Sequence, residues 1–365
     1  MKTYETQEKP KRAFLVSVVK GDPSDEPFAN ELCGLCQTLE LDIIYHTKIR
    51  IREKSSKYIA GTGKAQEISE KAKELKTDLI VLDLNPSPSQ QRSWEELCGI
   101  PVLDRQEIII RIFAQRATTR EAELQVRLAQ LNYNLPRLTH KYIDLSRQRG
   151  GRYGTKGSGE TKFETDRRKV EKRISQLEKE IEQVSKQRQM QRRQRERQGV
   201  HTCAIVGYTN SGKSSLLNAL TGANVLAENK LFATLDAITR RFEPAPGKQV
   251  LLTDTVGFIR DLPHTLIKAF RSTLEEAALA NTLIVVLDAS DPNIESQYET
   301  TLSVLRELGA GEIPVITILN KIDKIPKNDE DLQDSLKNRF PGSIAMSVKD
   351  RIGLDFLKNK IVSML

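Results

Sequence analysis

The feature that most constrains the fold is a glycine-rich loop between a buried strand pattern and a helical pattern. Residues 207–214 have the sequence GYTNSGKS, which matches G-x-x-x-x-G-K-S, follows the apolar run HTCAIV and opens the helical pattern KSSLLNAL. Such a loop wraps phosphates in backbone N–H groups at a helix N-terminus, while its lysine reaches the β- and γ-phosphates and its final hydroxyl ligates Mg²⁺. The alternative is a chance glycine-rich turn, which the flanking strand and helix disfavour. The residues expected to contact the nucleotide here are Gly207, Tyr208, Thr209, Asn210, Ser211, Gly212, Lys213, Ser214 and Ser215.

A second motif, D-T-V-G at residues 254–257, closes the apolar strand pattern VLLTD. The pattern D-x-x-G is common by itself, but here it follows the phosphate loop by about 40 residues at a strand end, as nucleotide hydrolases require. Asp254 is placed to hold the Mg²⁺ shell, and the Gly257 N–H to meet the γ-phosphate.

The segment LFATLD, residues 231–236, lies where a switch threonine is needed. The Thr234 hydroxyl could complete the Mg²⁺ shell only when the γ-phosphate is present. Thr221, Thr239 and Thr253 are alternatives for this role. The expected metal ligands are therefore Ser214, Thr234 and Asp254, the expected catalytic set is Lys213, Thr234 and Gly257, and Phe232 is expected to contact the nucleotide.

A third motif, N-K-I-D at residues 320–323, follows the strand pattern VITIL and predicts guanine recognition. The Asp323 carboxylate can accept hydrogen bonds from the N1–H and the 2-amino group of guanine, and adenine offers neither donor. Asn320 is expected to support the base edge, and the stem of Lys321 to cover the base face. After the last strand pattern, the backbone of Ser347, Val348 and Lys349 is expected to touch guanine, with a simple helix cap as the alternative.

Two residues bear on the rate of hydrolysis. Phe258 follows the D-T-V-G motif, where signalling GTPases carry a glutamine that orients the attacking water. Because phenylalanine can neither donate nor accept that hydrogen bond, we expect slow intrinsic hydrolysis that depends on outside help or on a group from elsewhere in the chain. Asn210 occupies a loop position where GTPases activated by a bound K⁺ carry asparagine, and the alternative is a loop asparagine that tolerates an unusual φ.

The chain before residue 200 divides into an α/β part and a helical part. Short apolar strands near 13–19, 41–46, 79–83 and 101–104 alternate with helical stretches, which predicts a parallel α/β domain over residues 1–115. Apolar residues then recur at spacings of three and four along two stretches, as in a coiled-coil seam, with Pro136 expected to end the first. We expect an antiparallel helical hairpin over 116–199 and a Ras-like G domain over 200–365, with strands near 201–206, 249–254, 283–288, 314–319 and 342–346.

Charge is concentrated in the hairpin. Residues 147–198 hold 17 of the basic side chains against 8 acidic ones, whereas the flanking parts are nearly neutral. The turn RQRGGRYGTKGSGETK interleaves glycine with Arg147, Arg149, Arg152 and Lys156. Such a segment attracts polyanions by releasing their counterions. The merely solvated flexible loop is the alternative.

The chain resembles the HflX family of translational GTPases over nearly its full length. The resemblance rests on Tyr58–Lys64, on residues 111–138, on the linker residues 150–152 and 157–168 (GSGETKFETDRR), and on the G-domain segments GYTNSGKSSLLNAL, LFATLDAITR, DTVGFIRDLPH and NKID. It implies a GTPase stimulated by ribosomes that binds the large ribosomal subunit and its rRNA, with a role in splitting or rescuing stalled or stressed ribosomes. It also adds weight to Thr234 as the switch threonine. Some members carry a further C-terminal domain after the last G-domain helix, and any function that rests on such a domain is left open here.

We expect a cytoplasmic monomer that uses Mg²⁺, takes GTP and GDP as ligands, and responds to K⁺ if Asn210 binds that ion. No run of about 18 apolar residues is present, so no membrane span is expected. The four cysteines form no disulfide framework, which favours a reducing compartment. The alternative function is a GTP-switched module that binds another RNA or acts in ribosome assembly, with incidental turnover.

Overall fold

The computed structural model describes residues 10–19, 29–51, 57–148, 158–197, 199–223, 228, 230–261, 266, 271–326 and 330–365. The chain divides into two compact units. The N-terminal unit combines residues 1–112 with 130–174, and the C-terminal unit combines residues 113–129 with 175–365. The two units alternate along the sequence, because the division between them falls within two long helices. The expected domains were continuous segments that end at residues 115 and 199, whereas each of the two units combines separate segments. The expected boundaries remain predictions.

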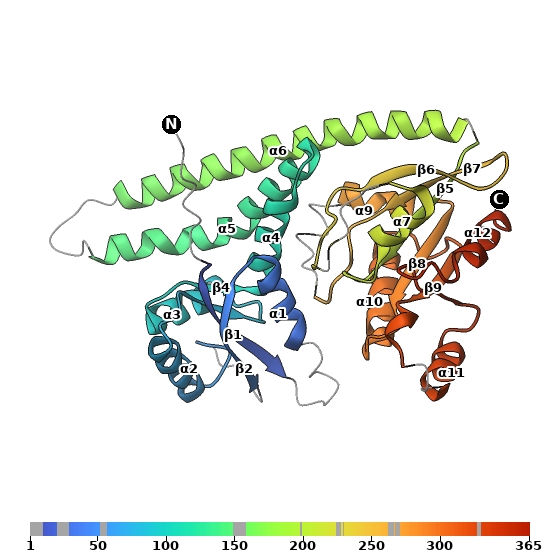
Figure 1. Cartoon of the computed structure of the whole chain (residues 1–365). Coiled ribbons are helices and arrows are strands. Elements are labelled where there is room, and N and C mark those ends of the chain that lie inside the picture. The colour runs from blue at the N-terminus through green and yellow to red at the C-terminus, as the bar shows by residue number, and fades with distance from the viewer. Residues whose placement is uncertain are drawn as a thin grey trace, which may run out of the picture. The chain divides into compact units, whose positions relative to one another are not determined.

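The N-terminal unit is built on a four-stranded parallel sheet (Figure 1). Its order is β2 (Asp42–Arg50), β1 (Arg12–Val19), β3 (Leu79–Leu82) and β4 (Val102–Asp104). The connecting helices are α1 (Ala29–Thr38), α2 (Thr62–Glu74) and α3 (Pro88–Cys98). Strand β3 is buried along its whole length, as expected of a parallel strand covered on both faces, and Phe14, Ile80 and Trp94 anchor one core cluster. The expected parallel α/β domain is confirmed.

Polar side chains fill the carboxyl ends of strands β3 and β4 in this unit. Arg105 forms buried ion pairs with Glu31 and Asp83. Asp104 accepts hydrogen bonds from the Tyr133 hydroxyl at 2.9 Å and from Arg137 at 2.8 Å. Burial raises the pKa of Asp104 to about 6, although Arg137 and Tyr133 oppose that rise. Open parallel sheets commonly bind ligands at the carboxyl ends of their strands. In this unit the ion pairs of Arg105 lie at those strand ends.

The helical part comprises α4 (Arg105–Arg116), α5 (Arg120–Gln148) and α6 (Ser158–Arg197). Helices α5 and α6 run antiparallel (Figure 1), and Arg120 near the start of α5 pairs with Glu180 of α6 at 3.2 Å. Leu124, Leu128 and Leu177 are buried in the expected seam. The prediction that Pro136 ends the first helix was wrong, since it lies inside α5. Proline removes one backbone hydrogen bond, and the apolar residues before it bury enough surface for the helix to continue.

The C-terminal unit is built on a mixed six-stranded sheet of order β10-β9-β8-β5-β7-β6. The strands are β5 (His201–Gly207), β6 (Ile238–Ala245), β7 (Lys248–Asp254), β8 (Thr282–Asp288), β9 (Val315–Asn320) and β10 (Ile344–Ala345). Strand β6 was not expected from the sequence. It pairs antiparallel with β7 at the edge of the sheet, where arginines and a proline are tolerated and obscure the strand pattern.

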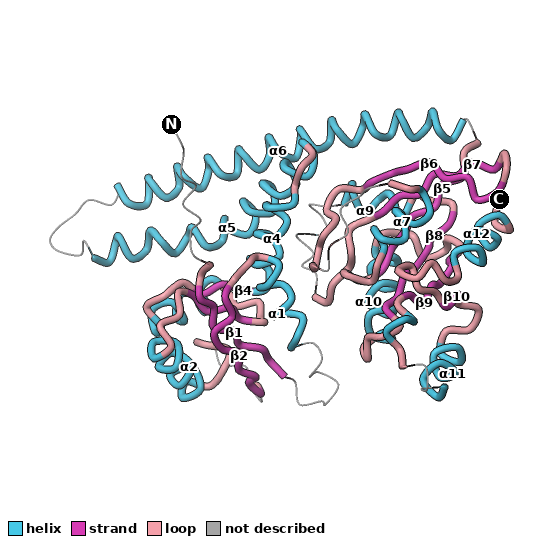
Figure 2. The backbone as a smooth tube through the Cα atoms, viewed as in Figure 1, coloured by secondary structure: helices cyan, strands magenta, loops and turns pink. Residues whose placement is uncertain are grey.

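Helices cover both faces of this sheet (Figure 2). Helices α7 (Lys213–Thr221) and α12 (Leu354–Val362) share a core cluster with residues of β5 and β8 that include Ile205 and Ile284. Helices α9 (Arg271–Ala278) and α10 (Ile294–Glu307) also contact β5. A 3₁₀ turn (Ile322–Lys324) and α11 (Glu330–Arg339) follow β9. The Ras-like P-loop architecture is therefore confirmed. In the described part of the chain no helix is long and apolar enough to cross a membrane.

Candidate guanine-nucleotide site

The phosphate loop joins β5 to α7 and requires glycine at two positions. Gly207 has φ 144°, and a Cβ there would lie 2.3 Å from the carbonyl oxygen of Val286. Gly212 has φ 101°, caps α7, and would bring a Cβ to 2.3 Å from Asn320 Nδ2. Only glycine allows this approach. The loop therefore presents its backbone N–H groups at the N-terminus of α7, where anions bind.

The D-T-V-G turn is hydrogen-bonded directly to the phosphate loop. Thr209 N donates to the carbonyl oxygen of Phe258 at 2.8 Å, and Phe258 N donates to the carbonyl oxygen of Gly207 at 3.0 Å. A Cβ on Gly257 would lie 2.8 Å from both Thr209 Cα and Lys213 Nζ. The backbone of Gly257 is thus held against the loop and its lysine. The Phe258 ring is fully buried and does not line the nucleotide cleft.

Lys213 is buried at the base of the loop. Its Nζ donates to the carbonyl oxygen of Tyr208 at 2.8 Å. Burial lowers the pKa of Lys213 to about 8, and the nearby Asp254 carboxylate opposes that shift. Nucleotide phosphates would supply the negative charge that the buried ammonium lacks and would favour its protonated form.

Three side-chain oxygens meet beside Lys213. Ser214 Oγ lies 2.7 Å from Thr234 Oγ1 and donates to Asp254 Oδ2 at 2.6 Å. Asp254 Oδ1 is buried with no hydrogen-bond partner among the described residues. Burial raises the pKa of Asp254, while Lys213 opposes the rise. Hydroxyl and carboxylate oxygens are the ligands that Mg²⁺ prefers, so this set fits the ion.

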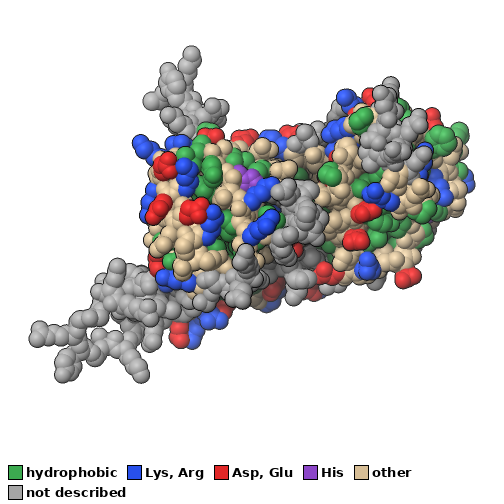
Figure 3. Space-filling model, turned by 90° about the horizontal axis from the view of Figure 1, so that it is seen from below, with side chains coloured by type: hydrophobic (Ala, Val, Ile, Leu, Met, Phe, Trp, Pro, Cys, Tyr) green, Lys and Arg blue, Asp and Glu red, His purple; other side chains and the backbone are tan. Residues whose placement is uncertain are grey.

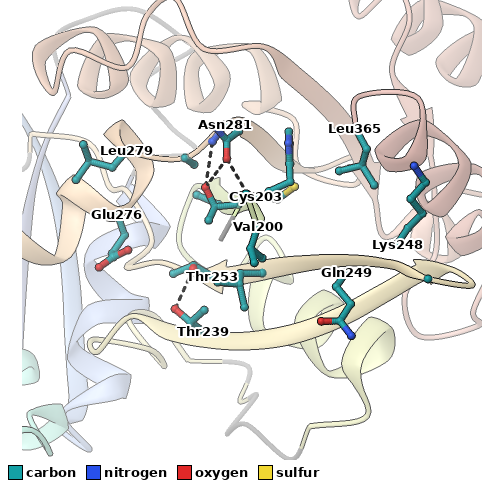
Figure 4. Close-up of a pocket in the computed structure, with 17 residues that line it drawn as sticks. Val200, Cys203, Thr239, Lys248, Gln249, Thr253, Glu276, Leu279, Asn281 and Leu365 are labelled. Atoms are coloured by element: carbon teal, nitrogen blue, oxygen red, sulfur yellow. Dashed lines mark hydrogen bonds between the residues drawn. The ribbon is translucent and has the colours of Figure 1, made fainter. Parts of the chain in front are cut away.

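The other threonines considered for the switch role lie elsewhere. The hydroxyl of Thr221 donates to the carbonyl oxygen of Leu217 within α7. Thr239 and Thr253 are hydrogen-bonded to each other at 2.9 Å, on the wall of a separate cavity of about 510 Å³ (Figure 4). That cavity lies at the amino end of β5, away from the phosphate loop. Among the four candidates, only Thr234 contacts Ser214.

The N-K-I-D loop, residues 320–323 and expected to read the base, is held by contacts with both neighbouring loops. Asn320 Nδ2 donates to the carbonyl oxygen of Ser211 at 2.9 Å, and Asn320 Oδ1 accepts from Val348 N at 3.2 Å. Ser347 Oγ donates to Asp323 Oδ1 at 2.8 Å. Helix α12 begins at Leu354 with Gly353 as its N-cap, so Ser347 does not cap that helix. The exposed Asp323 carboxylate is thereby oriented by a hydroxyl from the loop after β10.

Most of the predicted residues line one cleft of about 860 Å³. Of the predicted set, the residues on its wall are Thr209, Asn210, Gly212, Lys213, Ser214, Ser215, Phe232, Thr234, Gly257, Asn320, Lys321, Asp323, Val348 and Lys349. Gly207, Tyr208, Ser211, Asp254 and Ser347 do not line the wall. Asn210 has φ 61°, an unusual conformation in which asparagine is several-fold enriched among residues other than glycine.

Sequence reasoning missed several residues of this cleft. Lys230, Lys324 and Arg351 add basic side chains to the wall. Asp288, at the end of β8, pairs with Lys321 at 2.8 Å and fixes the lysine that is expected to cover the base. The available signal for Asp288 was a carboxylate that directly follows the apolar run Leu283–Leu287, because the carboxyl ends of parallel strands meet at one edge of the sheet.

Phosphate, metal and guanine chemistry converge in this one cleft on a doubly wound sheet, and the class of protein that combines them is the P-loop GTPase. Three protein families match the chain in order: "GTP-binding GTPase N-terminal" over residues 27–114, "GTP-binding GTPase Middle Region" over 116–195 and "50S ribosome-binding GTPase" over 202–321. The chain belongs to the HflX family of GTPases, and its activity is the hydrolysis of GTP.

Relatives and a solved structure agree with this assignment. The GTPase HflX of Akkermansia muciniphila is 48% identical over 378 residues, covering 99% of this chain and 86% of its own. The GTPase HflX of Escherichia coli is 42% identical over 298 residues, covering 82% of this chain and 70% of its own. A crystal structure described as "SsGBP and GDP complex" superposes with a TM-score of 0.52 at 26% identity, covering 97% of this chain and 98% of that one.

Proposed function

We propose that this GTPase requires Mg²⁺ and that its GTP state binds the large ribosomal subunit through the helical part, where it splits or rescues stalled ribosomes. The observation that carries the proposal is the position of Thr234 beside Ser214 and Asp254. A switch segment with its threonine at the metal ligands can distinguish GTP from GDP, because only GTP supplies a γ-phosphate to hold it.

Different residues of the cleft have different roles in hydrolysis. The backbone N–H groups of the loop and the Lys213 ammonium bind the β- and γ-phosphates and neutralise the charge that develops on them. The Gly257 N–H, held next to Lys213 Nζ, is placed to contact the γ-phosphate. Asp323, held by Ser347, accepts hydrogen bonds from guanine, while Lys321 covers the base. These groups position the nucleotide for in-line attack by water.

Ser214, Thr234 and Asp254 would hold Mg²⁺, which would offset the negative charge of the phosphates. The buried Phe258 ring cannot take the place of the water-orienting glutamine. Basal hydrolysis is therefore slow, and a partner supplies the missing stabilisation. The large ribosomal subunit is the partner that the family suggests.

The proposed rRNA contact rests on charge and on the family. The family matched by residues 202–321 is described as a "50S ribosome-binding GTPase". The basic surplus of the chain lies in residues 147–198, while acidic and basic side chains are interspersed on the face shown in Figure 3. The glycine-rich residues 149–157 lie outside the described residues, and so do the side chains of Arg147, Arg149, Arg152 and Lys156.

We also propose that the protein acts as a monomer in the cytoplasm. All four cysteines are free, and Cys36, Cys98 and Cys203 are buried in apolar surroundings. Burial raises the pKa of each of these three thiols, which keeps them protonated and unreactive. Free thiols are the ordinary state in a reducing compartment.

GTP turnover with and without purified large ribosomal subunits tests the proposal. We expect a large rise in turnover with large subunits and little with small subunits. Competition by tRNA or precursor rRNA, with no preference for the mature subunit, would favour the alternative partner. Unchanged turnover despite GTP-dependent binding would instead indicate a switch module with incidental hydrolysis.

A further inference from the structure

The segment that carries Thr234 is held from outside the G motifs. We call residues 230–236 the switch segment and residues 113–119, between the last turn of α4 and the start of α5, the corner. Both belong to the C-terminal unit, although the corner precedes the phosphate loop by about 90 residues of sequence. Contacts between the two lie on either side of Thr234.

On the carboxyl side of Thr234, the Asp236 carboxylate binds the start of α5. It accepts hydrogen bonds from Thr118 Oγ1 at 2.8 Å, from Thr118 N and Thr119 N at 3.3 Å each, and from the Thr119 hydroxyl. Thr119 Oγ1 in turn accepts from Ala122 N and so caps the helix. A carboxylate at this position also interacts favourably with the positive end of the helix dipole.

On the amino side of Thr234, the ring of Phe232 packs edge-on against the ring of Phe113, with centroids 4.7 Å apart. Both rings are buried. Phe232 has φ 56°, a conformation that a bulky residue rarely adopts. Packing against Phe113 therefore stabilises a backbone shape that the segment would not keep by itself. Arg116 adds an ion pair with Glu228 at 2.7 Å.

We propose that the corner is a positioning element for GTP hydrolysis, which holds Thr234 at Ser214 and Asp254 through Asp236 and Phe232. Thr234 lies two residues from each anchor, so anchoring both sides restricts the positions open to its hydroxyl. A free switch segment must lose conformational entropy when it orders around GTP. The corner removes part of that loss in advance. The proposal rests on the proposed role of Thr234.

The corner also makes the hydrogen bonds at the start of α5 depend on the position of the switch segment. Four donors at the start of α5 share one acceptor, Asp236. When the switch segment leaves Ser214, those donors lose their partner. The start of the helical part is thus coupled to the presence of the γ-phosphate, and by reciprocity the corner changes the affinity for GTP relative to GDP.

The test uses the full chain with Asp236→Ala, which removes the acceptor and leaves the Thr119 cap of α5 intact. Asp355→Ala, at a surface carboxylate in the first turn of α12, is the matched control. We expect Asp236→Ala to lower kcat, and the affinity for a non-hydrolysable GTP analogue with Mg²⁺, by about tenfold, the order expected for hydrogen bonds to a charged group. GDP affinity should stay unchanged, because the Thr234 hydroxyl is expected to complete the Mg²⁺ shell only when the γ-phosphate is present.

A double-mutant cycle separates positioning from simple destabilisation. In the Thr234→Ala background, Asp236→Ala should cause no further loss of kcat. Wild-type kcat and GTP-to-GDP preference in Asp236→Ala, or an equal loss in both backgrounds, would overturn the proposal. Wild-type behaviour of Thr234→Ala alone would instead overturn the Thr234 assignment on which it rests. Asp236→Asn, which keeps an acceptor oxygen, should recover part of the loss.

Discussion

Asn320 of the N-K-I-D loop donates a hydrogen bond from Nδ2 to the carbonyl oxygen of Ser211 in the phosphate loop, 2.9 Å away. The neighbouring Lys321 donates to the carbonyl oxygen of Asn210 at 2.6 Å. The loops expected to bind guanine and phosphate are therefore joined by direct hydrogen bonds. Such preorganisation lowers the ordering cost of binding.

Changing Asp323 to Asn should reverse base preference. The asparagine side chain would present a donor where guanine offers donors, and the 2-oxo group of xanthine needs a donor. We expect GTP affinity to fall by roughly 10³-fold or more, since sites built on such hydrogen bonds reject the unmatched analogue by large factors. Competition binding with GTP, XTP and ATP measures the change. Asp350→Asn, at the other carboxylate that accepts from Ser347, should keep GTP preference. Equal wild-type binding of ATP and GTP would refute the assignment.

Replacing Ser214 with alanine should impair Mg²⁺-dependent nucleotide binding. The change removes the hydroxyl that contacts both Thr234 and Asp254 and leaves the Asp254 carboxylate buried with fewer partners. We expect Mg²⁺–GTP binding to weaken by roughly 2–4 kcal/mol, the order expected when a hydrogen bond to a charged group is removed from a closed site. Nucleotide titrations with and without EDTA check this. Thr221→Ala, whose hydroxyl bonds within α7, is the control and should bind normally.

Lys213 should make GDP affinity depend on pH. The protonated lysine is the form that binds phosphate, and burial lowers the pKa of Lys213 to about 8. Affinity should therefore be constant below about pH 7.5 and decline as pH rises through 8, by about tenfold per unit at most. Fluorescent GDP titrations between pH 7 and 9 measure it. Lys213→Ala should bind more weakly but without this decline, and a wild-type profile that stays flat to pH 9 would contradict the assignment.

Phe258 predicts a low basal turnover, and Asn210 predicts how that turnover depends on the monovalent cation. Slow basal hydrolysis is expected because Phe258 cannot orient water. If Asn210 binds K⁺, turnover in KCl should exceed turnover in NaCl at matched ionic strength, and Asn210→Ala should abolish the difference. Equal rates in the two salts would leave Asn210 as a loop residue chosen for its φ of 61°.

Replacing Arg147, Arg149 and Arg152 with alanine should weaken binding to the large ribosomal subunit. A protein that neutralises fewer phosphates releases fewer counterions, so the dependence of affinity on salt should flatten by about one unit of slope for each arginine that pairs with a phosphate. Basal turnover should not change, and stimulated turnover should fall. Sedimentation with subunits over a range of KCl concentrations measures the slope. Loss of basal activity with normal ribosome binding would show that these arginines serve the G domain.

The chemistry of the nucleotide site could be predicted from the sequence because its motifs are local. Residues 207–214, 254–257 and 320–323 each carry their function within a single loop, and the apolar strands before them place those loops at one edge of a sheet. Interior parallel strands such as β3 and β8 were also predictable, since strands buried on both faces are mostly apolar along their length.

Only the tertiary structure decided among residues whose roles depend on distant partners. The sequence left four threonines open for the switch role, and of these four only Thr234 contacts Ser214. Residues Ile238–Ala245 form a strand because they pair with β7, although their own sequence pattern is weak. Helix α5 continues past Pro136 because its apolar residues are packed. The corner that binds Asp236 lies more than a hundred residues away in sequence. In each case the stabilising contacts come from another part of the chain, and local patterns do not contain them.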